Sequence, residues 1–304
     1  MIRVATDVGG TFTDLVYFEI DEKTKKAKKI SKAKSDTTPP NYDKGVFNTI
    51  NDAEIDISEA SFFAHGTTVI INSITERKGA KVGLITTKGF RDSLEIARGD
   101  RPDFFNLRYK KPEPFIPRYL RKEMTGRMDF LGREVEKLEL SELNKIITTF
   151  KKNNVTSIAI CFLHSYANPE HEIKVSKKIQ ETWPEFELIS SNELTREWRE
   201  YERTSTTALC AFVKPVARQY LDKLYKQLKT HKFKGTPYVM QSNGGIDTFD
   251  STKKTPLTII ESGPTSGVLG AAEIGKLIGV KDIIALDIGG TTAKCSLIEN
   301  GNVK

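Results

Sequence analysis

Two short runs of the chain combine an aspartate, a glycine pair and a threonine in a spacing that suits phosphate chemistry. The first is Asp7-Val8-Gly9-Gly10-Thr11, and the second is Asp287-Ile288-Gly289-Gly290-Thr291, 280 positions later (287 − 7). The open backbone amides of a glycine pair can close on phosphate oxygens, and threonine hydroxyls can join them. A nearby aspartate can hold a hydrated Mg²⁺. The predicted chemistry is the binding of a polyphosphate between two opposed loops.

Each run lies between two apolar, β-branched stretches, so residues 3–18 and 283–298 are predicted to form β-hairpins that turn at the glycine pairs. The alternative is a pair of ordinary glycine turns. A generic turn needs glycine for its positive φ, but it does not need a fixed aspartate before it and a threonine after it. The repetition therefore favours phosphate loops.

The duplicated hairpin resembles the two phosphate loops of the superfamily that contains actin, sugar kinases and heat-shock chaperone ATPases. Further runs resemble the hydantoinase A and 5-oxoprolinase family, which also contains the acetone carboxylase beta subunit. These runs are residues 64–68 (Ala-His-Gly-Thr-Thr), 83–92, 199–207, 241–245 (Gln-Ser-Asn-Gly-Gly) and 262–264 (Ser-Gly-Pro). Together with the two hairpins they extend over the whole chain.

The resemblance implies an α/β protein with the actin-like ATPase (ribonuclease H-like) fold, comprising the first half and the opening hairpin of the second half. It implies an N-terminal region at residues 1–280 and the start of the hydantoinase A domain at residues 281–304. In the family a complete second half follows this hairpin and carries the adenosine-binding loop. We therefore expect both phosphate loops here, without the pocket for the nucleotide base.

The activity implied by the resemblance is ATP- and Mg²⁺-dependent opening of a cyclic amide or imide, of the hydantoin or 5-oxoproline type, by phosphorylation of its carbonyl oxygen. A B-type hydantoinase subunit is the implied partner. One alternative is a beta-type subunit of an ATP-dependent ketone carboxylase. Another is a truncated, non-catalytic binding or regulatory module of the same fold, which the early end of the sequence and Lys294 favour.

The resemblance also implies roles for particular residues. The implied catalytic residues are Asp7, Asp287, His65 and Arg203, and the implied metal ligands are Asp7, Asp14 and Asp287. The implied ATP-binding residues are Gly9, Gly10, Thr11, Thr13, Gly289, Gly290, Thr291, Thr292, Gly244, Gly245, Glu261 and Gly263. The implied substrate-side residues are Thr67, Thr68, Asn243 and Arg98.

Three of these roles have ordinary structural alternatives. An isolated histidine is more often a core residue than a site residue, but the Gly-Thr-Thr run after His65 favours a site. Arg98 can bind a carboxylate or a phosphate in bidentate fashion, or it can make a surface contact. Arg203 lies in a charged, hydroxyl-rich helix that can equally be a salt-bridged surface.

The second hairpin departs from the family pattern. The relatives have Thr-Asp at the positions where this chain has Ala293-Lys294. The exchange of an acid for a cation changes the local charge by about two units, and this weakens metal binding unless another group compensates.

Composition limits the other partners. The chain has 304 residues and a formal charge of +7, and seven lysines lie between positions 23 and 34. These lysines lack interleaved aromatic residues, so they predict a solvated strand edge and not a nucleic-acid surface. The three cysteines are widely spaced and are expected to be reduced, buried thiols. The sequence shows neither a leader nor a run that could span a membrane, so a cytoplasmic protein is expected.

The elements that must position these residues alternate between strand and helix. Strands are predicted at 26–35, 61–64, 81–86, 156–162, 187–190 and 237–241; helices at 42–53, 68–77, 141–153, 169–182, 196–211, 216–228 and 267–277. Residues 98–117 are expected to be irregular, and residues 118–135 to form a β-hairpin turning at Leu131-Gly132. The middle portion is expected to be an inserted second lobe.

Overall fold

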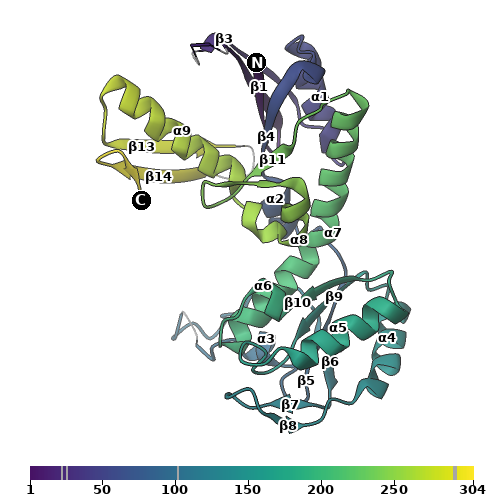
Figure 1. Ribbon diagram of the computed structural model, residues 1–304. Coiled ribbons are helices and arrows are strands. Elements are labelled where there is room, and N and C mark those ends of the chain that lie inside the picture. The colour runs from purple at the N-terminus through teal and green to yellow at the C-terminus, as the bar shows by residue number, and fades with distance from the viewer. Residues whose placement is uncertain (22, 25–26, 101–102, 290–292) are drawn as a thin grey trace. The chain divides into compact units, whose positions relative to one another are not determined.

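The computed structural model describes residues 1–21, 23–24, 27–100, 103–289 and 293–304. The described chain forms two compact units (Figure 1). Residues 1–78 and 216–304 form the first, which we call the discontinuous unit, and residues 79–215 form the inserted unit. The inserted lobe expected from the sequence is thereby confirmed.

The main sheet of the discontinuous unit contains, within the described residues, six strands in the order β12-β11-β4-β1-β2-β3. These strands are β1 (Ile2–Val8), β2 (Phe12–Ile20), β3 (Ala27–Asp36), β4 (Ala60–Thr67), β11 (Pro237–Met240) and β12 (Ile246–Thr248). The hairpin neighbours β1, β2 and β3 are antiparallel, whereas β4 and β11 continue the sheet parallel to β1. The lysine-rich β3 lies at the edge of the described sheet, as predicted.

Helix α1 (Tyr42–Asp52) packs against β1, β2 and β3. Its apolar side chains recur at helical spacing, and Val46, Phe47 and Ile50 are buried. On the sheet, Val4 and Leu15 are buried at alternate strand positions. The helical repeat of 3.6 residues and the strand repeat of 2 residues thus place the apolar faces of α1 and of the sheet in one shared core.

Strand β4 is longer than the sequence predicts, and α2 (Val69–Thr75) begins directly after it. His65 therefore lies inside the strand and not in the loop that follows it. The ladder extends this far because β4 has a partner on each side, with His65 opposite Thr6 of β1 and Val239 of β11.

The two helices predicted at 196–211 and 216–228 are wrong as separate elements, because they form one helix, α7 (Glu200–Thr230), with Pro215 inside it. Proline usually breaks a helix because it removes one hydrogen bond and crowds the preceding turn. Here a continuous apolar stripe that includes Val213, Ala217 and Leu221 is fully buried, so tertiary packing outweighs the local cost.

In the described part of the inserted unit, four parallel strands lie in the order β10-β9-β5-β6. They are β5 (Val82–Thr87), β6 (Arg121–Met124), β9 (Ser157–Cys161) and β10 (Glu187–Ser190). The helices of this unit include α3 (Ser93–Ile96), α4 (Leu143–Lys152), α5 (Glu170–Thr182) and α6 (Ser191–Leu194).

The hairpin predicted at residues 118–135 is wrong in its first half. Residues 121–124 form β6, which pairs parallel to β5, and only β7 (Arg127–Met128) and β8 (Glu134–Glu136) form a hairpin. Leu120 and Met124 are buried, and this burial favours pairing with a core strand over pairing with the exposed β8.

The second phosphate hairpin is present as β13 (Ile283–Ile288) and β14 (Ala293–Glu299), followed by β15 (Asn302–Val303). It follows α8 (Phe249–Lys254) and α9 (Ser262–Ile278). Both hairpins are confirmed as antiparallel pairs. Cys161 and Cys210 are buried as expected, but Cys295 of β14 is exposed, so the expectation of a buried thiol is wrong for this residue.

Within the described ranges, no helix combines the length and the apolar character needed to cross a bilayer.

A buried carboxylate organises the inserted unit. Glu172 of α5 is fully buried and accepts hydrogen bonds from the backbone N–H of Phe162 (2.8 Å) and of Asn192 (2.9 Å). It also accepts from the hydroxyls of Ser191 (2.7 Å) and Ser190 (3.0 Å). Glu172 thereby ties α5 to the ends of β9 and β10.

The variant Glu172→Gln is expected to lower the free energy of unfolding by about 2–3 kcal/mol, because an amide nitrogen would face donors that need an acceptor. Urea denaturation followed by circular dichroism measures this change. The matched control is Glu181→Gln, at an exposed position of the same helix, which should change stability by less than about 0.5 kcal/mol. Equal stabilities of the two variants would contradict the assignment.

Candidate phosphate-binding site

A cavity of about 400 Å³ in the discontinuous unit is lined by residues of both glycine hairpins. The first hairpin contributes Asp7, Gly9, Gly10, Thr11 and Asp14, and the second contributes Asp287, Gly289 and Lys294. Thr68 and Asn72 line it from the start of α2. The two repeats, which lie far apart in the sequence, therefore meet at one cavity. Gly290, Thr291 and Thr292 lie outside the described residues.

Asp7 occupies the most constrained position at this cavity. A Cβ atom at Gly66 would lie 2.7 Å from Asp7 Oδ1, and a Cβ atom at Gly263 would lie 2.9 Å from the same oxygen. The side chain of Asp7 thus fits between two backbones that approach closely because both residues are glycine. Its buried Oδ1 atom has no hydrogen-bond partner among the described residues.

Burial raises the pKa of Asp7 from its usual 3.8 to about 6, and the neighbouring carboxylates of Asp14 and Asp287 add to this rise. Burial and like charge both disfavour the ionised form. A cation at this position would relieve both effects and would supply the partner that Oδ1 lacks.

The donor set fits Mg²⁺. Mg²⁺ is commonly bound by one or two carboxylates, with phosphate oxygens and water completing its shell. In the ranges that the structure describes, no group of three or more histidine, cysteine, aspartate or glutamate side chains forms a metal-binding cluster. Asp7 and Asp287, which both line the cavity, are the residues that would hold the ion together with phosphate oxygens.

The strand register gives Lys294 a defined position. Asp7 lies opposite Asp14 in the first hairpin, and Asp287 lies opposite Lys294 in the second. Lys294 is thus the counterpart of Asp14, 280 positions later (294 − 14). It forms an ion pair with Glu261, at the start of α9, and Asp14 forms one with Lys34 at 3.1 Å.

The threonines differ in their access to the cavity. Thr11 and Thr68 line it, and the Thr68 hydroxyl donates to the Val8 carbonyl (3.2 Å). Thr13 is fully buried, and its hydroxyl is hydrogen-bonded to that of Thr37 (3.1 Å). Thr67 is also fully buried, and its hydroxyl accepts from the Val69 N–H (3.1 Å).

His65 is a fully buried residue of the sheet. Its Nδ1 atom is hydrogen-bonded to the Thr6 hydroxyl (2.7 Å) and its Nε2 atom to the Tyr220 hydroxyl. Burial lowers the pKa of His65 to about 3, so the ring is neutral at neutral pH. This is the environment of a core histidine, and within the described structure His65 does not line the cavity. Its catalytic role stays a prediction.

The predicted arginines belong to the inserted unit. The Arg203 guanidinium is buried and donates to the carbonyls of Glu197 (3.0 Å) and Phe162 (2.6 Å). Arg98 is ion-paired with Glu202. Both side chains have partners inside their own unit, and their roles toward a substrate stay predictions.

The Gln-Ser-Asn-Gly-Gly run forms a tight turn after β11. The Gly245 N–H donates to Asn243 Oδ1 (2.9 Å), and Gly244 adopts a φ of +89°, which favours glycine. The Ser242 hydroxyl accepts from the Glu261 N–H (3.0 Å), so the turn supports the start of α9. Among the described residues, this turn is not part of the phosphate-site lining. The nucleotide contacts of Gly244 and Gly245 and the substrate contact of Asn243 stay predictions.

The sequence did not reveal the contacts that hold the backbones around Asp7. The Ser262 hydroxyl accepts from the Thr67 N–H (3.0 Å) and donates to the Thr67 carbonyl (2.9 Å). This pair of bonds fixes the end of β4 to the start of α9. Gly66 lies inside a recognised motif, but only the register of β1 and β4, which places it opposite Asp7, shows its role.

Comparisons with known proteins agree with this architecture. The family described as the hydantoinase/oxoprolinase N-terminal region matches residues 3–183, and the family described as hydantoinase/oxoprolinase matches residues 203–304. An uncharacterised protein of Methanocaldococcus jannaschii is 40% identical over 99% of this chain and 44% of its own length.

Two solved structures are similar over nearly the whole chain. A nucleotide-free acetone carboxylase structure has a TM-score of 0.86 at 26% identity, covering 100% of this chain and 44% of that one. The ATP-dependent caprolactamase of Pseudomonas jessenii has a TM-score of 0.81 at 30% identity, covering 97% of this chain and 43% of that one. The chain therefore spans less than half the length of these relatives.

The paired hairpins and the mixed sheet define an α/β protein of the actin-like ATPase fold, represented by the first half and the opening hairpin of the second. The chain belongs to the hydantoinase/oxoprolinase family.

The close approach of Gly263 to Asp7 can be tested with a matched pair of substitutions on α9. Gly263→Ala should lower the free energy of unfolding by about 1–3 kcal/mol, because its Cβ would displace Asp7. Gly267→Ala has open space around its Cβ and should be neutral or slightly stabilising. Thermal unfolding of both variants measures the difference, and an unaffected Gly263→Ala would refute the close contact.

The raised pKa of Asp7 predicts a pH-dependent stability. Because the folded state favours the protonated acid, this contribution is complete below pH 3.8 and is lost as the pH rises through about 6. Asp7→Asn keeps an uncharged group, so at pH 8 it should be more stable than the wild type by about 1–3 kcal/mol. The difference should vanish near pH 4. Thermal unfolding across pH 4–8 without added metal tests this, and a difference independent of pH would contradict it.

Proposed function

We propose that this chain is the phosphate-binding part of an ATP- and Mg²⁺-dependent enzyme that opens a cyclic amide or imide. The observation that carries the proposal is the meeting of the two glycine hairpins at one cavity, beside a buried aspartate oxygen without a partner. The names of the relatives support ATP dependence, since one solved relative is an ATP-dependent caprolactamase and the family includes oxoprolinases.

In the proposed reaction, the carbonyl oxygen of the ring receives the terminal phosphoryl group of ATP, and ADP is released. Water then adds to the carbonyl carbon, the ring nitrogen takes up a proton and leaves, and a second water releases the phosphate. Mg²⁺, when bound, would neutralise charge on the phosphate oxygens.

The residues of the chain would bind and orient the phosphates. Gly10, Thr11 and Gly289 line the cavity, and their backbone amides would donate to phosphate oxygens. The Gly9 N–H, in contrast, donates to the Phe12 carbonyl within the turn (2.9 Å). Asp7, held by Gly66 and Gly263, would fix the metal ion in position. Such preorganised groups stabilise the charge that develops in transfer without reorganising during the reaction.

A second candidate is a non-catalytic binding module, and one observation favours it. Lys294 occupies the position equivalent to Asp14 and pairs with Glu261, so the second hairpin places a cation where the first places an acid. A ketone carboxylase subunit remains an alternative within the enzymes, since acetone carboxylase is similar in structure.

We also propose that the chain works with further polypeptide. A relative named caprolactamase subunit alpha and one named acetone carboxylase beta subunit support a multi-subunit assembly. The partner that we propose is a B-type hydantoinase subunit. We further propose that residues 1–280 form the N-terminal region and that residues 281–304, which contain the second hairpin, begin the hydantoinase A domain.

Calorimetric titration of the chain with ATP and Mg²⁺ tests the proposal. We expect saturable binding that requires Mg²⁺ and is weakened by roughly tenfold or more in Asp7→Ala, because the ion would lose its buried ligand. The control is Asp52→Asn, an exposed residue outside the cavity, which should bind as the wild type does. The absence of binding in the wild type would overturn the proposal for this chain. Binding without ring opening, even with the completing polypeptide present, would favour the non-catalytic module.

A further inference from the structure

A second cavity lies next to the phosphate site in the discontinuous unit. It has a volume of about 510 Å³, within the range of small-molecule sites. Gly10 of the first phosphate loop and Asn72 of α2 line both cavities. A molecule in the second cavity would therefore lie beside the loop that we propose for the terminal phosphates.

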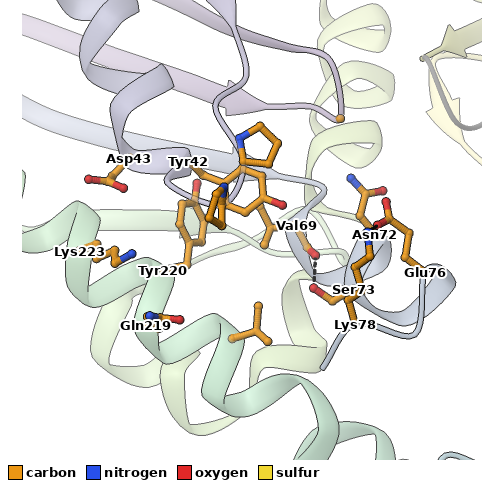
Figure 2. A pocket seen from close by; sticks show the side chains of 14 residues that line it. Tyr42, Asp43, Val69, Asn72, Ser73, Glu76, Lys78, Gln219, Tyr220 and Lys223 are labelled. Carbon is orange, nitrogen blue, oxygen red and sulfur yellow. Dashed lines mark hydrogen bonds and ion pairs between the residues drawn. The ribbon is translucent and has the colours of Figure 1, made fainter. Parts of the chain in front are cut away.

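The cavity is walled by three helices and is both aromatic and polar. Figure 2 shows Gln219, Tyr220 and Lys223 of α7 on one side, and Asn72 and Ser73 of α2, with Glu76 directly after that helix, on another. Tyr42 and Asp43, from the first turn of α1, complete the wall. Aromatic walls with a few placed polar groups are typical of sites for small organic ligands.

Asp43 is the polar group that needs explanation. Its side chain is 6% exposed and lines the cavity, and its Oδ1 atom has no hydrogen-bond partner among the described residues. A buried acceptor without a donor costs free energy, whereas a donor brought by a ligand recovers that cost. The cavity thus favours a ligand that carries an N–H or O–H group.

The other charged groups of the cavity have partners. Lys78 forms an ion pair with Glu76 (2.7 Å), and Lys223 donates to the side-chain carbonyl of Asn41 (3.0 Å). Among the described lining residues the two acids, Asp43 and Glu76, are balanced by the two lysines. This balance favours a ligand without net charge.

We propose that this cavity binds the acceptor substrate, a small neutral ring with an amide N–H, and that Asp43 accepts the hydrogen bond from that N–H. The assignment rests on the proposed function, because that function requires the ring carbonyl to face Gly10 and the phosphate groups of ATP. Asp43 also discriminates between substrate classes, because a lactam or hydantoin brings a donor to its free oxygen and a simple ketone brings none.

Saturation-transfer NMR with the 304-residue chain tests this assignment, with three ring probes of similar size: a lactam, its N-methyl derivative and the corresponding cyclic ketone. The wild type, in the presence of ATP and Mg²⁺, should bind the lactam roughly tenfold or more tightly than the other two. Asp43→Asn should reduce this preference to about threefold or less, because the side-chain amide can present a donor instead of an acceptor. Equal binding of all three probes by the wild type, or an unchanged preference in Asp43→Asn, would overturn the assignment.

Two further variants separate folding and nucleotide effects from ring recognition. Gln219→Trp changes an exposed position on α7 and fills the cavity without altering its charge, so it should abolish lactam binding and leave ATP binding unchanged. Asp52→Asn makes the same exchange as Asp43→Asn at an exposed position of α1 and should retain the preference. If ATP binds and the lactam does not, the inference fails while the phosphate site stands. If ATP does not bind, the proposed function itself fails.

Discussion

The confinement of Asp7 between the backbones of Gly66 and Gly263 is the constraint on which the rest of the site depends. It requires the end of β4 and the start of α9 to approach β1 within van der Waals distance, and the Ser262 hydroxyl secures that approach through both backbone groups of Thr67. The same confinement excludes water from Oδ1 and raises the pKa of Asp7. One arrangement therefore produces both the close packing and a carboxylate whose ionised form is disfavoured. Such a carboxylate is typical of a site that binds a cation.

The two cavities share a wall, and this connects the proposed phosphate chemistry to the proposed substrate. Helix α2 has only two turns, yet it contributes to both cavities. Asn72 lines both of them, while Val69 and Ser73 line only the second. Each cavity contains one aspartate with a buried oxygen that has no partner within the described chain, Asp7 in one and Asp43 in the other. Asp7 lies near other carboxylates and suits a metal ion. Asp43 lies in a wall whose charges balance and suits a hydrogen-bond donor on a neutral ligand.

The second hairpin repeats the geometry of the first without repeating its charges. Identical strand registers place Lys294 where Asp14 stands in the first repeat, and Glu261 neutralises that lysine. The apolar residues Ile284, Leu286 and Ile288 are largely exposed on β13, whereas their counterparts in β1, Val4, Thr6 and Val8, are buried. The first hairpin pairs with β3 and β4 and is covered by α1, whereas the second, within the described residues, pairs with the short β15 and contacts α9.

The sequence by itself determined the two hairpins and the α/β order, because turn chemistry and apolar periodicity are local properties. Tertiary structure decided the rest. Two predicted helices joined through Pro215 because one apolar stripe is buried along both, and residues 121–124 joined the central sheet because Met124 is buried there. His65 is fully buried within the sheet because β4 pairs with a strand on each side. The roles of Gly66, Ser262 and Asp43 follow from contacts between distant segments, and no local pattern in the sequence records such contacts.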